Sequence, residues 1–176
     1  MWSFTTRLTI MMTEQLYHEY PHNAPTLLET EIYPIRWDVC SIHQPPDISG
    51  LPSLDYALYL FETVKFHLGQ SYRFFDEGAF LSNLHEFYHG NAAQRAADYR
   101  LWFIQFLLVV SFGTALLSRS KGTDPPGSKF FTRAMSLMPD HASLWKDSLL
   151  AIEVLAMAAL YLYSIDQRES GQIYVS

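Results

Sequence analysis

Cysteine is nearly absent from this sequence, since Cys40 is the only one in 176 residues. A single thiol excludes an internal disulfide, and it also excludes a cysteine-rich zinc cluster built within the chain. No neighbour beyond His43 is suited to activate Cys40, so we interpret this residue as a bystander rather than a nucleophile.

Basic charge is also scarce. The 12 lysines and arginines are outnumbered by 18 aspartates and glutamates, which leaves a net charge of −6. Because affinity for DNA comes largely from cations that neutralise phosphates, this balance argues against direct nucleic-acid binding. One local basic group surrounds a segment rich in glycine and proline, and we interpret it as a solvated loop. Its members are Arg119, Lys121, Lys129 and Arg133.

Long apolar runs and glycine-rich phosphate loops are missing as well. The two most apolar segments, Leu101–Leu117 and Leu149–Tyr163, are shorter than the roughly 20 residues of a membrane-spanning helix, and they contain Gln105 and Glu153. We favour two buried helices of a soluble bundle, with a small helical membrane protein as the alternative. No secretory signal is evident near Met1, so we expect an intracellular protein.

Apolar residues nevertheless make up 49% of the sequence, and aromatic residues 15%. Disordered chains carry far fewer such residues, and the length suits one domain with a core of its own. Proline interrupts every possible helix in residues 1–54, so we predict a linker or loosely ordered arm there. Ile35, Trp37 and Val39 are the residues of this arm that we expect to dock on residues 55–176.

Beyond the arm, apolar periodicity, capping residues and glycines predict a series of helices. The expected fold class is all-α, an irregular helical bundle behind a proline-rich, mostly non-regular N-terminal arm. The predicted helices run from Ser53 or Asp55 to His67, from Gly78 to Tyr88, from Ala92 or Asp98 to Ser118, from Ser128 to Met138, from a cap at Asp147 to Tyr163, and from Arg168 to Val175.

The segment His85-Glu86-x-x-His89 matches the zinc-peptidase motif His-Glu-x-x-His. On a helix this spacing places both imidazoles on one face, where they could bind zinc while the glutamate deprotonates a bound water. No histidine follows at the metzincin spacing, and the next glutamate is Glu153. We interpret the motif as the exposed end of a helix, with His85 and His89 as the metal candidates of a zinc metallopeptidase, the alternative function.

A set of methionines and aromatic residues could line a pocket for a small molecule or a coactivator. Packing in the core is the interpretation that we favour, because such sets normally fill helix interfaces. The set comprises Phe130, Phe131, Met135, Met138, Trp145 and Met157.

Residues 55–176 also carry short motifs in a definite order. They include Tyr56-Ala-Leu-Tyr-Leu-Phe, Thr63-Val-Lys-Phe-His-Leu-Gly, Phe75-Asp-Glu-x-x-Phe80-Leu, Leu107–Leu117, Phe130-Phe-x-x-Ala-Met, Pro139-Asp, Leu144-Trp-x-Asp and Asp166-x-Arg-Glu-Ser. This series resembles the fungal-specific transcription factor domain, the helical middle region of fungal zinc-cluster regulators that includes the xylanolytic-activator regulatory type.

The resemblance implies regulation of transcription in the nucleus, by a regulatory region that does not itself read DNA. In that family a separate six-cysteine cluster holds zinc and contacts DNA, so both zinc and DNA binding are implied only outside this chain. The family pattern continues beyond the Arg168-Glu-Ser segment, and the domain therefore looks truncated. We expect no catalytic residue, no cofactor and no membrane contact in this chain. We expect the Ala151–Tyr163 helix to expose apolar surface, which favours a protein partner or self-association.

Overall fold

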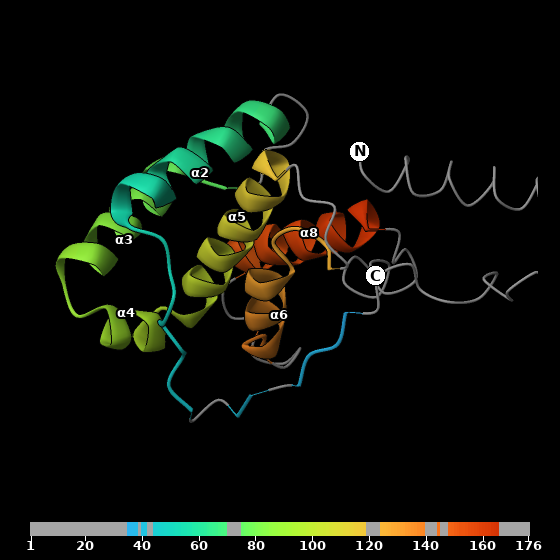
Figure 1. The fold of residues 1–176 in the computed structure, drawn as a ribbon. Helices are drawn as coiled ribbons and strands as arrows, with labels where there is room; N and C mark the ends of the chain where they lie inside the picture. Colours follow the sequence, from blue (N-terminus) through green and yellow to red (C-terminus); the bar gives the residue numbers. More distant parts are fainter. Residues whose placement is uncertain are drawn as a thin grey trace, which may run out of the picture.

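The computed structural model describes residues 35–38, 40–41, 44–69, 75–118, 124–139, 144 and 148–165. These residues form helices and no strand, which confirms the all-α fold class. The helices are α2 (Leu54–Leu68), α3 (Glu77–His89), α4 (Ala92–Asp98), α5 (Arg100–Leu117), α6 (Ser128–Ser136) and α8 (Ser148–Ser164), and Figure 1 shows their arrangement. The predicted cap at Asp147 and the predicted helix Arg168–Val175 lie outside the described residues.

Short polar side chains cap the first three helices as local chemistry requires. Ser53 accepts a hydrogen bond from the backbone amide of Tyr56, Asp76 one from Ala79, and Asn91 one from Gln94. Each cap satisfies an amide that has no partner within the helix. The prediction placed the starts of α2 and α3 within a residue or two of where they occur, because these signals are local.

Two starts were predicted for the helix that ends near Ser118. The start at Asp98 lies close to that of α5 at Arg100, whereas the residues from Ala92 form a separate helix, α4, and the two helices meet at Tyr99. Tyr99 leaves the helical conformation, with φ −114° and ψ 50°. The guanidinium of Arg95 lies 3.7 Å from the centroid of the Tyr99 ring, a cation–π contact at the junction. Neither proline nor glycine marks the break, so the sequence gives no local signal for it.

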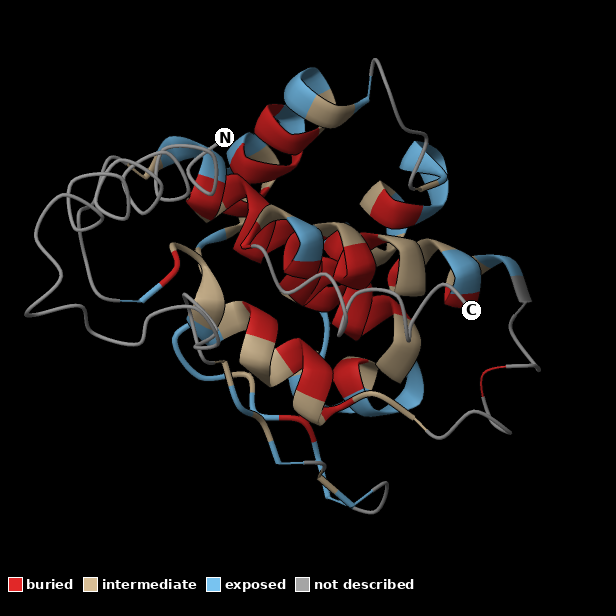
Figure 2. Cartoon of the chain, turned by 90° about the vertical axis from the view of Figure 1, so that its right-hand side faces the viewer, coloured by how far each residue is buried: buried red, intermediate tan, exposed pale blue. Residues whose placement is uncertain are grey.

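Helix α5 forms the middle of the bundle. It contacts α2, α3, α4, α6 and α8, and in Figure 1 it lies between α2 on one side and α6 and α8 on the other. Figure 2 shows buried residues concentrated where the helices meet. Among the described residues, α5 is the one helix long and apolar enough to cross a membrane by length and composition, and 72% of it is buried inside the fold.

Two glycines permit close contacts of α5 with its neighbours. A Cβ atom at Gly113 would lie 2.8 Å from Cβ of Leu60 and 3.1 Å from its Cα, so the missing side chain lets α2 pack directly on α5. Gly127, with φ of +83°, precedes α6, and a Cβ there would lie 2.2 Å from the carbonyl oxygen of Ser111. Glycine is required here for two reasons: the backbone is in the left-handed region, and it lies too close to the α5 backbone to leave room for a side chain.

The loop before α6 is fixed to two helices by hydrogen bonds. The Ser111 hydroxyl donates to the Gly127 carbonyl at 2.9 Å, and the Tyr161 hydroxyl of α8 donates to the Pro126 carbonyl at 3.0 Å. Burial raises the pKa of Tyr161, since the ionised phenolate would be desolvated. The loop before α6 is therefore packed against both α5 and α8.

The described part of the arm lies against the helical body. Trp37 packs edge to face on Phe131 with ring centroids 5.8 Å apart, and Ile35 also contacts the core. The backbone amide of Cys40 donates to the Ser136 carbonyl of α6 at 2.8 Å. The Tyr88 hydroxyl donates to the Pro52 carbonyl, and burial raises the Tyr88 pKa to about 12. The expected docking is therefore confirmed for Ile35 and Trp37, while Val39 lies outside the described residues.

The methionine and aromatic set belongs to the core, as predicted. Phe131, Met135 and Met157 are fully buried, while Phe130 and Met138 are partly buried against the same cluster. Trp145, the remaining member, lies outside the described residues. The ring of Phe131 stacks on that of Tyr161 at 4.2 Å, which joins α6 to α8.

Candidate functional site

His85 and His89 lie one turn apart on the exposed surface at the end of α3. Their ring centroids are 5.9 Å apart, and Nδ1 of His89 lies 2.9 Å from the His85 carbonyl oxygen. Glu86 is turned to the neighbouring helix, where its carboxylate forms a 2.5 Å ion pair with Arg95 of α4. The group that would act as general base is therefore paired with a guanidinium.

Glu153, the candidate third zinc ligand, lies at the other end of α3. Its carboxylate accepts a 2.9 Å hydrogen bond from Gln105 and lies beside Asp76, whose backbone amide also donates to it. Asp76 caps the N-terminus of α3, so a helix of 13 residues, about 20 Å long, separates it from His89. No group of three potential metal ligands occurs among the described residues.

Arg95 joins α3 to α4. Besides Glu86 and the Tyr99 ring, it donates to the Asn83 side chain at 2.8 Å. The open depression beside it has a volume of about 510 Å³ and is lined by polar side chains of the two helices. Within it Glu86 pairs with Arg95 and Gln94 with Asp98, which indicates a brace between helices rather than a recognition site. Sequence reasoning missed this role of Arg95, because its partners come from a different helix.

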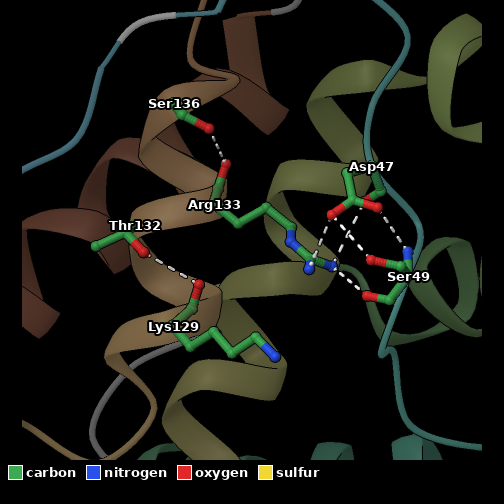
Figure 3. Close-up of polar contacts among 6 residues, drawn as sticks. All are labelled: Asp47, Ser49, Lys129, Thr132, Arg133 and Ser136. Carbon is green, nitrogen blue, oxygen red and sulfur yellow. Dashed lines mark hydrogen bonds and ion pairs between the residues drawn. The ribbon is translucent and has the colours of Figure 1, made fainter.

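A second polar cluster, shown in Figure 3, fastens the arm to α6. The Arg133 guanidinium lies 3.1 Å from the Asp47 carboxylate and donates to the Ser49 carbonyl at 2.8 Å. The Arg133 side chain is only 14% exposed, whereas that of Asp47 is 61% exposed. Hydrogen bonds from the Ser49 amide and hydroxyl, reinforced by the charge of Arg133, hold the Asp47 pKa below its usual value.

This cluster corrects the interpretation of the basic group as a solvated loop. Arg133 lies within α6 and forms a partly buried ion pair, and Lys129 is an exposed residue in the first turn of the same helix. Arg119 and Lys121 lie outside the described residues. Lys129 and Arg133 are close in sequence, but in the fold one is exposed and the other forms an ion pair with the arm.

An apolar feature of the described surface runs along α8. Leu149, Ile152 and Tyr163 are 68%, 63% and 57% exposed, and they lie on the side of α8 that faces away from α5. Ala156 and Leu160 fall on the same side and are intermediate in exposure. We call these five residues the α8 stripe.

The opposite side of α8 is packed into the core. Val154, Met157, Ala158, Tyr161 and Leu162 are completely buried there. A helix that is apolar all round is normally covered on all sides, but the described residues cover only one side of α8. Within the part of the chain that the structure describes, the stripe is therefore a surface suited to a partner.

No known protein family, curated protein or solved structure matches this chain.

A smaller aromatic feature lies on α2. Tyr56 and Tyr59 stack on each other at 6.1 Å and are exposed, and Phe66 further along α2 is 70% exposed. Glu62 and Lys65 are interspersed with these rings, and Lys65 forms a 2.7 Å ion pair with Glu77. The charges make this surface more polar than the α8 stripe, which carries none.

Proposed function

We propose that this chain is a regulatory module of a transcription regulator of the fungal zinc-cluster type. In this proposal it acts in the nucleus by binding a protein through the α8 stripe, and it neither reads DNA nor catalyses a reaction. The motif order along residues 55–176 supports the family, and the net charge of −6 supports a role away from DNA phosphates.

The observation that carries the proposal is the uncovered apolar side of α8. Leu149, Ile152 and Tyr163 expose more than half of their surfaces, and none of the five residues of the α8 stripe is charged. Exposed apolar patches of this kind mark interaction surfaces in soluble proteins. Polar clusters elsewhere, at Glu86 with Arg95 and at Asp47 with Arg133, are internally paired and offer little to a ligand.

A reporter assay tests the proposed function. The chain would be fused to an unrelated DNA-binding domain in a fungal reporter strain, and transcription would be compared with that from the DNA-binding domain alone. We expect a change in reporter output of several fold. We expect Ile152→Asp to abolish most of it, because the carboxylate would have to be desolvated in a protein contact.

Ser82→Asp is the matched control, since it adds the same charge at an exposed position on α3. It should leave reporter output unchanged, provided that immunoblots show equal amounts of the fusions. If the fusion with the parent chain gave the same reporter output as the DNA-binding domain alone, with equal amounts of both proteins in the nucleus, the proposed function would be contradicted. If Ile152→Asp and Ser82→Asp lowered reporter output equally, the α8 stripe would not be the surface through which the chain acts.

A further inference from the structure

We infer that His85 and His89 form a two-histidine site that binds a divalent transition-metal ion without peptidase chemistry. The inference goes beyond the proposed function, because the site lies on α3 and does not involve the α8 stripe. It follows from the positions of the two rings, from the hydrogen bond that orients one of them, and from the charges around them.

The two imidazoles project from one face of α3. Their residues are four apart in the helix, and both are exposed. The ring centroids lie 5.9 Å apart, and the ring planes are inclined by 30°. With nitrogen–zinc bonds of about 2.0–2.1 Å and a tetrahedral angle, a chelate would place the centroids about 5 Å apart. The remaining difference is less than about 1 Å, which exposed side chains close by small rotations.

A hydrogen bond prepares His89 for coordination. Its Nδ1 lies 2.9 Å from the His85 carbonyl oxygen. A carbonyl oxygen can only accept, so Nδ1 carries the proton and the lone pair of the neutral ring is on Nε2. Histidines that bind metals usually donate their other ring nitrogen to a carbonyl or carboxylate, which fixes the tautomer and the ring orientation. His89 therefore has the tautomer that a metal ligand needs.

The nitrogen atoms that would bind the metal are free. Within the part of the chain that the structure describes, His85 forms no hydrogen bond or ion pair, and His89 uses only its Nδ1. Glu86 is held by Arg95 in a 2.5 Å ion pair. The charges of this pair cancel, so Arg95 does not leave an unbalanced positive charge beside the histidines. Because Glu86 is engaged in this way, the site lacks the free general base of a zinc peptidase.

The end of α3 is a favourable place for a cation. His89 is the last residue of the helix, and Gly90 follows it as the cap. The carbonyl groups in the last turn of a helix give that end a partial negative charge, which stabilises nearby cations. The electrostatics of the helix therefore act in the same direction as the two imidazoles.

His67 shows which part of this arrangement is specific to the pair. It is also exposed near the end of a helix, and its Nδ1 lies 2.8 Å from the Thr63 carbonyl oxygen. No other histidine lies within four residues of it in the sequence. His67 can therefore supply only one metal bond, whereas His85 and His89 together supply two.

The ligand atoms select the class of metal. Imidazole nitrogen suits Cu²⁺, Ni²⁺ and Zn²⁺, whereas Mg²⁺ and Ca²⁺ prefer oxygen ligands. Affinity at a given nitrogen site is highest for Cu²⁺ in this series. Two protein ligands leave the other coordination positions to water, so we expect reversible binding that is weaker than in a structural site with four protein ligands.

Calorimetric titration of the chain with NiCl₂ tests the site. A His22→Ala background is used, because His18 and His22 have the same spacing in the sequence. We expect His85→Ala and His89→Ala each to weaken binding at least about tenfold, since the second imidazole binds at a high effective concentration. His67→Ala is the matched control and should leave the affinity unchanged. If neither His85→Ala nor His89→Ala weakened binding, or if the chain bound no Ni²⁺, the inference would be overturned.

Nitrogen-15 spectra of the histidine rings, recorded with ZnCl₂, identify the ligand atoms. We expect the Nε2 resonance of His89 and one ring nitrogen of His85 to shift together, while Nδ1 of His89 keeps its proton. MgCl₂ should shift neither ring. Zinc bound through Nδ1 of His89, or through only one of the two histidines, would overturn the two-histidine geometry.

Discussion

Gly127 shows most directly how one residue is constrained by the packing around it. Its φ of +83° lies in the left-handed region, and its α-carbon sits against the carbonyl of Ser111 in α5. The Ser111 hydroxyl and the Tyr161 hydroxyl hold the loop from either side. Any side chain at this position would strain the backbone and push the loop from α5.

Gly127→Ala should therefore destabilise the fold. We expect a loss of roughly 2–4 kcal/mol, from the left-handed conformation together with the displacement of the loop. Urea unfolding followed by circular dichroism measures it. Gly78→Ala is the matched control, because Gly78 is an exposed residue in the first turn of α3, where alanine stabilises by up to about 1 kcal/mol. Similar losses for both variants would contradict this reading of Gly127.

Glu153 is a second residue that is affected by its surroundings, which raise its pKa. Desolvation raises its pKa, with a further contribution from the negative charge of Asp76, and the Gln105 hydrogen bond offsets part of the effect. Between the unfolded value of about 4.3 and the raised folded value, the folded chain binds more protons than the unfolded chain. The contribution of Glu153 to stability thus falls as the pH rises through this window.

Glu153→Gln should consequently stabilise the chain at pH 7. Glutamine is uncharged and its one oxygen can still accept from the Gln105 amide. The desolvation penalty and the repulsion from Asp76 therefore disappear, at the cost of the hydrogen bond from the Asp76 backbone amide. The advantage should shrink near pH 4, where the parent carboxyl is protonated too. Thermal unfolding at both pH values tests this, and a lower melting temperature for the variant at pH 7 would contradict it.

At the scale of elements, the arm and α6 are held together by Asp47, Ser49 and Arg133. The partners are separated by more than 80 residues in sequence, since Arg133 donates to the Ser49 carbonyl 84 residues earlier. Because the guanidinium is largely buried and serves both a carboxylate and a carbonyl, it has geometric requirements that a lysine could not meet.

Arg133→Lys should loosen the arm without unfolding the helices. We expect a loss of about 1–2 kcal/mol, because the donors to the two arm residues cannot all be replaced by one ammonium group. Limited proteolysis should then cut residues 44–53 several times faster. Lys129→Ala, an exposed change on the same helix, should stay within about 0.5 kcal/mol of the parent. Unchanged cleavage of Arg133→Lys would show that other contacts hold the arm.

The same cluster has a defined pH dependence. The Asp47 pKa is lowered in the folded chain, so its carboxylate contributes stability above the unfolded value of about 3.9. That contribution is lost as the pH falls through the lowered folded value. Asp47→Asn should lower stability at pH 7, and the difference from the parent should vanish on acidification to about pH 2. A difference that persists in acid would point to packing instead of charge.

At the scale of the whole molecule, α5 and Phe131 make the bundle a single packed unit. Helix α5 contacts the other five described helices, and Phe131 connects Trp37 of the arm, Tyr161 of α8 and its own helix. Elements that share one core in this way are expected to unfold together.

Phe131→Ala should destabilise the whole fold by about 3–5 kcal/mol, through lost burial and the cavity left behind. Circular dichroism and tryptophan fluorescence should still report one coincident urea transition at lower midpoint. Phe66→Ala, at a ring that is 70% exposed on α2, should change stability by less than about 0.5 kcal/mol. Two separate transitions in the Phe131 variant would show that the arm or α8 unfolds independently.

Local signals in the sequence were sufficient to predict most of the described helices. Capping by Ser53, termination near Gly90 and the apolar stretches of α5 and α8 depend on residues within one or two turns. These signals have direct physical causes in unpaired backbone amides and in side-chain periodicity. The alternative start at Asp98 lies close to the start of α5, but the separate helix α4 before it was not predicted, because no helix-breaking residue marks the junction at Tyr99.

The sequence by itself determined an acidic, all-α chain with two apolar helices and with too few cysteines for a zinc cluster. Only the tertiary structure decided which side of α8 stays uncovered, which residue pairs with Arg133, and how far Glu153 lies from His89. The reason is that α8 is apolar on all sides, so its own periodicity cannot distinguish the packed side from the exposed one. Packing against α5 makes that choice, and it leaves Leu149, Ile152 and Tyr163 on the surface.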